Sequence, residues 1–524
     1  MPNTGKPSPN CHLCRQRRVK CDLARPQCQR CIKYGVQCPG YRDDQSLRFQ
    51  HADSAKFEQR RRKKHQHVTT PSSDTLQVVV FTPDSTVSSP ASSVASHRST
   101  PPLLRAVWQH WTAESVPLVL GCYSSLDFLP SLFKGLGEDH CLTLTGHVFT
   151  RAYVINRFGP HGLGQGVDHR ELSTYLGKAL SSVSSAVNNP NTCTSDATIV
   201  AVWLLGNYEL MMGGVERRSF VHRRDEVSSP AAPWHIHSKG LLSLLRARGD
   251  RQLYSRSGRQ IFWVMHNIIQ IQCTITNTPC PPEFDHWLCI IERTLQPQEP
   301  LFLHSGRYIS SACSLLSRLM PITGEGDITR ACAEYEQLLA EFDKAELDML
   351  GWMHSAPQFQ IGAGPVFRYF WNTWRGTRIK LHHMMILVTN LVEHAPDCPF
   401  DSRSLQARRR LCLEIIATTA QEVVDSIPES SGDRMLDTSA HTPAAYFDAI
   451  RLIWPLSHLY VVPTAPRHLR IVAREALLRI GREKGILTAL KPRPGGWRFA
   501  PEALKGIALD DLEAPSASPP YIVS

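Results

Sequence analysis

The sequence lacks any long apolar run. No stretch of about 18 apolar residues occurs among its 524 residues, so no membrane-spanning helix is predicted. The longest apolar candidates, such as Ile199 to Leu205, are too short to span a bilayer and are typical of a buried helix. Met1 to Asn10 contains no apolar core of a secretory signal, so we expect an intracellular protein whose thiols stay reduced.

The sequence motifs of several common enzyme classes are also missing. There is no G-x-S-x-G, no H-E-x-x-H and no phosphate-binding P-loop, and the 23 histidines, including His382-His383, show no ligand spacing. We therefore expect no enzymatic activity. An enzyme with its site in the C-terminal part is the alternative, and it would need a set of catalytic residues that the sequence does not display.

Acidic residues are scarce at one end of the chain. Residues 1–70 hold 16 Lys and Arg against five Asp and Glu, so the whole formal excess of +11 lies there. The remaining 454 residues carry equal numbers of both signs. Such asymmetry indicates a polyanionic partner, although charge alone would also fit a solvated basic tail.

The same segment is rich in cysteine. Six of the 16 cysteines follow the spacing C-x2-C-x6-C-x6-C-x2-C-x6-C, a triplet repeated after 17 residues: Cys11, Cys14, Cys21, Cys28, Cys31 and Cys38. Structural zinc takes four ligands, so two zinc ions need two bridging sulfurs. The repeat restricts the bridging pair to Cys11/Cys28, Cys14/Cys31 or Cys21/Cys38, and the spacing does not choose among them. Disulfides would need an oxidising compartment, and iron–sulfur spacings differ.

This segment resembles the fungal two-zinc, six-cysteine transcription factors. The resemblance covers Cys11 to Cys38, with the basic run from Arg15 to Lys20 and Pro26 in the central loop. It implies two Zn²⁺ per chain, with Cys11 and Cys28 as bridges. Cys14 and Cys21 would complete one site, and Cys31 and Cys38 the other. We read the ten cysteines from Cys122 to Cys412 as small core residues.

The basic residues of the two halves differ in number. Short helices are expected after each C-x2-C pair, and only the first carries four cations: Arg15, Arg17, Arg18 and Lys20. Arginine and lysine can donate to guanine O6 and N7 in the major groove. The resemblance implies a CGG-type triplet, with Arg17 and Arg18 as candidates for base contact. Arg15 and Lys20 are candidates for phosphate contact, and contact with phosphate alone is the alternative for each of the four.

Further along, composition divides the chain. The basic run Arg60, Arg61, Arg62, Lys63, Lys64 predicts nuclear localisation or a further phosphate-binding arm, against a merely solvated charge run. Residues 66–102 are rich in Ser, Thr and Pro and predict a disordered linker. We expect a disordered tail at 1–10, the cluster domain at 11–40, a basic extension at 41–65, the linker at 66–102, an all-α regulatory domain at 103–505 and a tail at 506–524.

The C-terminal body shows helical periodicity and no convincing strand alternation. Predicted helices include Asp196–Met212, apolar nearly all round and so central, and Leu411–Ile427, ended by Pro428. Apolar residues at helical spacing predict two more helix faces: Tyr335, Leu338, Leu339 and Phe342, and Leu172, Leu176, Leu180 and Val183. The body is similar to the helical regulatory region of the same fungal factors through Cys38–Phe49, Ser195–Met211 and His235–Gly249. Phe367 to Trp374, with Met384 and Met385, predicts core, or alternatively a small-molecule pocket.

Together these features predict a nuclear regulator that binds double-stranded DNA. Expected partners are the transcription machinery or co-regulators, with a small-molecule effector as a candidate. A cluster that binds another protein instead of DNA is the rival hypothesis. Between Pro39 and Thr70 no apolar heptads occur, so we expect residues 1–70 to be monomeric and any homodimer to form through the helical body.

Overall fold

The computed structural model describes residues 10–11, 13–14, 17, 19–24, 27–39, 110–158, 169–213, 233–359, 364–431, 445–490 and 499–507. The chain divides into two compact units, Met1–Leu103 and Leu104–Ser524, each of which is considered by itself. The predicted basic extension at 41–65, the linker at 66–102 and the tail beyond residue 507 lie outside the described residues.

The first unit has little regular structure. Leu13 and Cys14 are helical, and the five-residue helix α2 spans Gln29–Lys33. Its core consists of the six cysteine side chains, and among the described residues Leu13 and Val19 are the partly buried apolar residues that pack against them. So small an apolar contribution cannot order a segment of this length, which is why a metal must supply most of the folding free energy.

The second unit is all-α in its described residues, which confirms the predicted class. Its shorter helices are η2 (Trp111–Glu114), α4 (Ser115–Cys122), α5 (Leu129–Phe133), η3 (Gly249–Leu253), η4 (Pro357–Phe359) and η6 (Leu487–Leu490). The longer ones are α6 (Cys141–Phe158), α7 (His169–Asn188), α8 (Asp196–Met212), α9 (Pro233–Arg248), α10 (Arg256–Thr276), α11 (Glu283–Arg293), α12 (Pro300–Glu325), α13 (Ile328–Ser355), α14 (Pro365–Glu393), α15 (Ser402–Ser431), α16 (Ala445–Val461) and α17 (Arg467–Glu483). Within the described part of the chain, no helix is long and apolar enough to cross a membrane.

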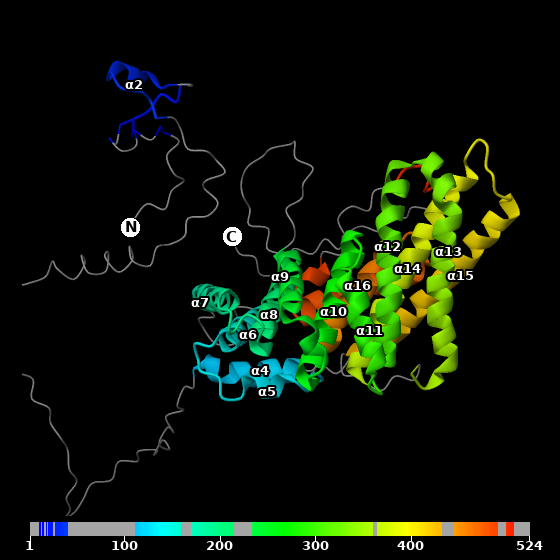
Figure 1. The fold of residues 1–524 in the computed structure, drawn as a ribbon, viewed down its shortest axis with the longest axis horizontal. Coiled ribbons are helices and arrows are strands. Elements are labelled where there is room, and N and C mark those ends of the chain that lie inside the picture. Colours follow the sequence, from blue (N-terminus) through cyan, green and yellow to red (C-terminus); the bar gives the residue numbers. More distant parts are fainter. Residues whose placement is uncertain are drawn as a thin grey trace, which may run out of the picture. The chain divides into compact units, whose positions relative to one another are not determined.

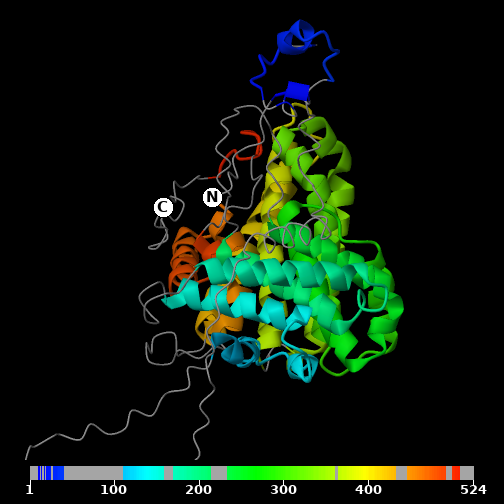
Figure 2. The ribbon, with the colours of Figure 1, turned by 90° about the vertical axis from the view of Figure 1, so that its left-hand side faces the viewer.

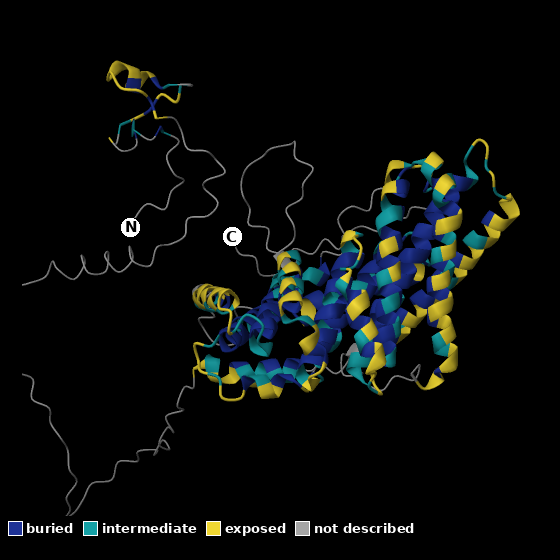
Figure 3. Ribbon diagram, viewed as in Figure 1, coloured by how far each residue is buried: buried dark blue, intermediate teal, exposed yellow. Residues whose placement is uncertain are grey.

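Helix α14 lies at the centre of a group of long helices in this unit. Its side chains are buried almost continuously from Phe370 to Val392. It packs against α12, α13, α15 and α16, which stand around it in Figure 1. The dark interior of the same helices in Figure 3 contrasts with the exposed outer faces of α13 and α15. Helices α4 and α5 lie at the lower edge of the unit both in Figure 1 and in the perpendicular view of Figure 2.

Helix α8 has the bounds that the sequence predicts. The Ser195 hydroxyl caps it by accepting from the Thr198 amide at 3.2 Å, and Gly213 ends it with φ +67°. Ile199 to Leu205 is buried throughout, as expected for a helix covered on all sides. The predicted core residues Phe370, Trp374, Met384 and Met385 are buried as well.

Two other helix predictions need correction. On α7, Leu172 and Val183 are buried, but Leu180 is 48% exposed and Ala179 takes the inward position. At 100° per residue, position 180 lies about 80° from position 172, whereas position 179 lies within about 20°. Helix α15 begins at Ser402 and continues past Pro428 to Ser431. A proline inside a helix costs about 3 kcal/mol, which the burial of several apolar side chains of α15 offsets.

The scattered cysteines are mostly core residues, as predicted. Five of the ten between Cys122 and Cys412 are buried and four are half-buried, whereas Cys289 is exposed. The prediction is therefore wrong for Cys289, which lies on the outer face of α11.

A buried polar network joins α12, α13 and α14. The Arg378 guanidinium donates to both Glu346 carboxylate oxygens, at 2.6 Å from Nη2, and the Tyr308 hydroxyl donates to Glu346 at 2.6 Å. Burial would raise the pKa of Glu346, but the neighbouring His382 and Arg378 hold it at about 2. Because burial lowers the pKa of His382, its ring is neutral at pH 7, and Arg378 is the permanent counter-charge.

Candidate metal centre

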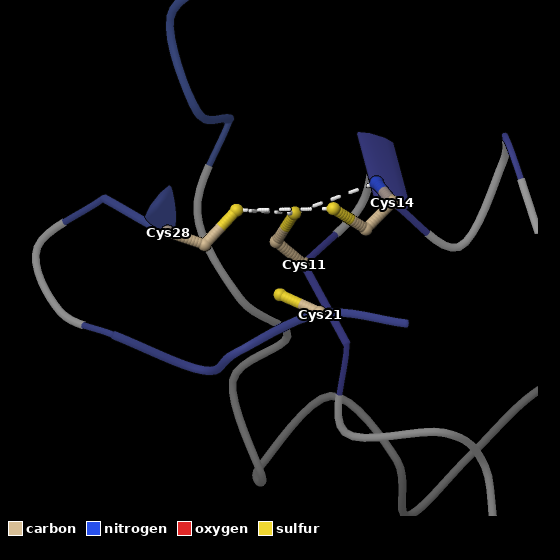
Figure 4. Close-up of side chains that lie close together, drawn as sticks. All are labelled: Cys11, Cys14, Cys21 and Cys28. Atoms are coloured by element: carbon tan, nitrogen blue, oxygen red, sulfur yellow. Dashed lines mark hydrogen bonds between the residues drawn. The ribbon is translucent and has the colours of Figure 1, made fainter. Parts of the chain in front are cut away.

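The six cysteine sulfurs of the first unit gather in one cluster. Their side chains are at most 8% exposed, although the segment around them is largely exposed. Cys11 Sγ lies 3.7 Å from the sulfurs of both Cys28 and Cys31, and Cys28 Sγ lies 3.8 Å from Cys14 and 4.0 Å from Cys38. Figure 4 shows four of the side chains pointing toward one another.

These separations suit a metal and not disulfides. A tetrahedral site with Zn–S bonds of roughly 2.3 Å places its sulfurs roughly 3.8 Å apart. A disulfide needs an S–S distance of roughly 2.05 Å, and none of the six cysteines forms one. Four thiolates are also the donor set that structural zinc prefers, so the residues fit the metal that the spacing predicts.

The sulfurs form two overlapping groups of four. One group is Cys11, Cys14, Cys21 and Cys28, and the other is Cys11, Cys28, Cys31 and Cys38, with ligand atoms within 4.8 Å of one another in each. Cys11 and Cys28 belong to both groups. The geometry thus favours this pair as bridges among the three that the spacing leaves open, in agreement with the resemblance.

Local backbone structure places the two shared cysteines. The Cys28 sulfur caps α2 by accepting from the Cys31 amide at 3.4 Å, and the Cys11 sulfur accepts from the Cys14 amide at the same distance. Each short helix therefore begins between the two cysteines of its C-x2-C pair. The expectation that the helices follow the pairs is wrong, because a capping sulfur must precede the first helical residue.

The thiols lie close together and out of water, and this controls their protonation. Burial, together with the thiols of Cys11 and Cys28, raises the pKa of Cys14 to about 12. Burial also raises the pKa of Cys28. Without a cation the thiols of Cys14 and Cys28 therefore stay protonated at neutral pH, and Zn²⁺, when bound, would supply the charge that favours their thiolate forms.

Asp22 is a supporting residue that sequence reasoning missed. Its carboxylate accepts from the amides of Gln29 at 3.1 Å and Arg30 at 3.4 Å, at the start of α2. The Gln29 amide is the main reason why the pKa of Asp22 is lowered. Asp22 follows Cys21 of the first triplet, but its carboxylate binds the start of α2 in the second triplet. The cysteine spacing gives no sign of this contact between residues seven positions apart.

The predicted DNA-contacting residues are described only in part. Arg17 and Lys20 are exposed, whereas Arg15 and Arg18 lie outside the described residues, as do Arg60 to Lys64. The Arg17 guanidinium carbon stands 3.2 Å from the centre of the Tyr34 ring. This cation–π contact ties the basic segment of the first triplet to the second triplet.

Comparison with known proteins gives a family match for the first unit. Residues 10–48 match the fungal Zn(2)-Cys(6) binuclear cluster domain. No curated protein and no solved structure matches the chain. Domains of this family bind two zinc ions, and the two overlapping thiol groups are arranged to hold them. The chain therefore carries a fungal Zn(2)-Cys(6) binuclear cluster domain at residues 10–48, and this domain supports a zinc-cluster, DNA-binding transcription regulator.

Proposed function

We propose that the cluster domain reads a CGG-type triplet in the major groove through the basic residues that follow Cys14. The observation that carries this proposal is the unequal charge of two halves that are alike in metal geometry. Four of the six residues between Cys14 and Cys21 are basic, whereas Lys33 is the one basic residue among the six between Cys31 and Cys38. In this proposal Arg17 and Arg18 donate to guanine O6 and N7, and Arg15 and Lys20 contact phosphates.

The Tyr34 ring gives Arg17 a defined position before DNA is bound. The ring is 60% exposed, so its burial in a core does not explain the contact. A long arginine side chain loses conformational freedom when it binds a base, and stacking on a ring removes part of that freedom in advance. Tyr34 therefore acts as a positioning residue for Arg17.

The rest of the chain serves this DNA-binding unit. We assign Arg60, Arg61, Arg62, Lys63 and Lys64 to nuclear import, and the body from residue 103 to 505 to regulation rather than catalysis. The transcription machinery or co-regulators are its proposed partners. Any homodimer would form through this body, since residues 39–70 lack heptads.

The test begins with selection of bound sequences from random double-stranded DNA by residues 1–70 loaded with zinc. Arg18→Ala should weaken binding to the selected triplet by about 1–3 kcal/mol and relax the preference at one base pair. Arg15→Ala should weaken binding to all sequences alike and reduce the slope of log affinity against log salt by about 1.

Two variants serve as controls. Lys33→Ala removes the matching charge from the second half and should leave base preference unchanged. Tyr34→Phe keeps the ring under Arg17 and should retain affinity, whereas Tyr34→Ala should lose affinity. Unchanged base preference in both Arg17→Ala and Arg18→Ala would refute the assignment. A selection that yields no enriched sequence would favour a cluster that binds protein.

A further inference from the structure

A cavity lies among five helices of the second unit, α8, α9, α10, α14 and α16, close to the end of α4. Its volume is about 50 Å³, which is room for roughly three to five waters or a slender organic group. The walls are mainly aromatic and aliphatic, and include Trp203, Ile268, Tyr369, Phe447 and Trp454. Apolar walls with a few polar groups are typical of small-molecule sites.

Arg451 of α16 is the one charged residue among the described residues of this lining. It is 2% exposed, and its guanidinium carbon stands 4.2 Å from the centre of the Phe447 ring. Its Nε donates to the Phe447 carbonyl at 2.7 Å, and Nη2 pairs with Asp448. Nη1 has no hydrogen-bond partner within the described part of the chain.

The charge around Arg451 is not balanced. Burial, together with the nearby Arg368, lowers the pKa of Arg451 to about 9. Two guanidinium groups therefore lie near one carboxylate, that of Asp448, and the described residues form no ion pair with Arg368. An added anion would relieve this imbalance.

Tyr123 supplies a second polar group at the cavity. Its side chain is 1% exposed and lines the cavity, and its hydroxyl lies beside that of Tyr446. Burial raises the pKa of Tyr123, so its hydroxyl keeps its proton. A hydroxyl and a guanidinium N–H are both donors toward an anion. Native structures leave few buried donors such as Arg451 Nη1 without a partner, so this group at a cavity indicates a ligand or ordered water.

We propose that this cavity binds a slender apolar monocarboxylate, with its carboxylate on Arg451 Nη1 and the Tyr123 hydroxyl and its body along the aromatic walls. One guanidinium N–H and one hydroxyl suit a single carboxylate group, whereas a phosphate dianion would need more donors than the lining offers. The walls beside Trp203 and Phe447 select an apolar body. This site belongs to the second unit and does not depend on the readout proposed above.

The experiment measures calorimetric binding and the shift of thermal midpoint for the full zinc-loaded chain without DNA. The probe is benzoate, with neutral benzamide and cationic benzylamine as matched compounds at constant ionic strength. Benzoate should bind about 10- to 100-fold more tightly than benzamide, the ratio expected for a hydrogen bond to a charged group. Benzylamine should not bind.

Three variants locate the binding. The double variant Asp448→Asn with Arg451→Met removes the ion pair as a whole, so that no unpaired charge stays buried, and should abolish the preference for benzoate over benzamide. Val264→Phe fills the cavity from α10 and should weaken both compounds. Arg246→Met removes an exposed arginine that pairs with Glu283 and should change neither.

Each outcome decides the proposal. Tight benzoate binding that is lost in the double variant and in Val264→Phe, with wild-type binding in Arg246→Met, supports it. Equal affinity for benzoate and benzamide, benzoate binding that survives Val264→Phe, or no binding at millimolar benzoate overturns it and leaves a cavity that holds only water. Because no DNA is present, none of these results bears on the readout of CGG triplets.

Discussion

Replacing a bridging cysteine should have a different effect from replacing a terminal one. Cys28 belongs to both groups of four sulfurs and Cys14 to only one. In residues 1–70, Cys28→Ala removes a ligand from each zinc site. Cys14→Ala removes one ligand from the first site and leaves the second group complete, with Cys11, Cys28, Cys31 and Cys38.

The energies involved are large for a segment of this size. A structural zinc contributes roughly 10–16 kcal/mol of folding free energy near pH 7. Leu13 and Val19 are the apolar side chains that pack on the sulfurs, and fully burying each would contribute about 1.5–3 kcal/mol. Loss of one zinc therefore removes more stabilisation than all of this apolar packing provides.

Metal content and cadmium-113 NMR measure the difference. The wild-type fragment should hold two metal ions per chain and give two cadmium resonances. Cys14→Ala should keep one ion and the resonance of the intact four-sulfur site, whereas Cys28→Ala should disturb both resonances together. Asp22→Ala, which keeps all six thiols, should retain two ions.

Two results would refute the bridged arrangement. A wild-type fragment with one metal ion would show that sulfurs are not shared. Equal loss from both sites in Cys14→Ala and Cys28→Ala would show that Cys28 is not special, and would leave Cys14/Cys31 or Cys21/Cys38 as candidate bridges.

Three other predictions concern stability and assembly. Glu346→Gln should destabilise the helical body by about 3 kcal/mol at pH 7, because the carboxyl pKa falls from 4.5 to about 2 on folding. The lowered pKa of Glu346 gives stability that is present above pH 4.5 and lost as the pH falls toward 2. In urea unfolding, the difference in unfolding free energy between the wild type and Glu346→Gln should therefore disappear over that range. The control Glu292→Gln, at an exposed ion pair, should change stability by at most about 1 kcal/mol. Sedimentation should find residues 1–70 monomeric, and a stable dimer would contradict the absence of heptads. Asp22→Ala should lower the affinity of the second zinc site more than that of the first, as competition with a chelator would show.

The metal ligands could be predicted from sequence because they are local. Six cysteines within 28 residues, at a repeated spacing, suffice to name the ligand set. The bridging pair could not be derived from that spacing, since the repeat treats all three pairs alike. The structure separates them because Cys11 and Cys28 precede the two short helices, where their sulfurs cap the backbone and meet at 3.7 Å.

The helical body was predictable where one physical signal dominates. Helix α8 is apolar on all sides and has a serine cap and a terminal glycine, so its bounds follow from sequence. Helix α14 is more deeply buried over a greater length, yet Arg378, Lys380 and His383 interrupt its apolar pattern. Their partners lie elsewhere in the chain, such as the Thr274 carbonyl of α10 at 2.5 Å from Lys380 Nζ and the Thr464 hydroxyl, in the turn after α16, at 3.0 Å from His383 Nδ1. Sequence alone does not bring these groups together.

The two units are each stabilised by a different kind of interaction. Six thiols organise the first unit, so its structure depends on metal and on the protonation of sulfur. The second unit has a large apolar core, with buried charges such as Arg378 paired inside it. We therefore expect that conditions that empty the cluster remove DNA binding while the helical body stays folded. Conversely, a ligand that binds the cavity of the second unit leaves the six zinc ligands chemically unchanged, so its effect on stability and the effect of metal removal can be measured separately.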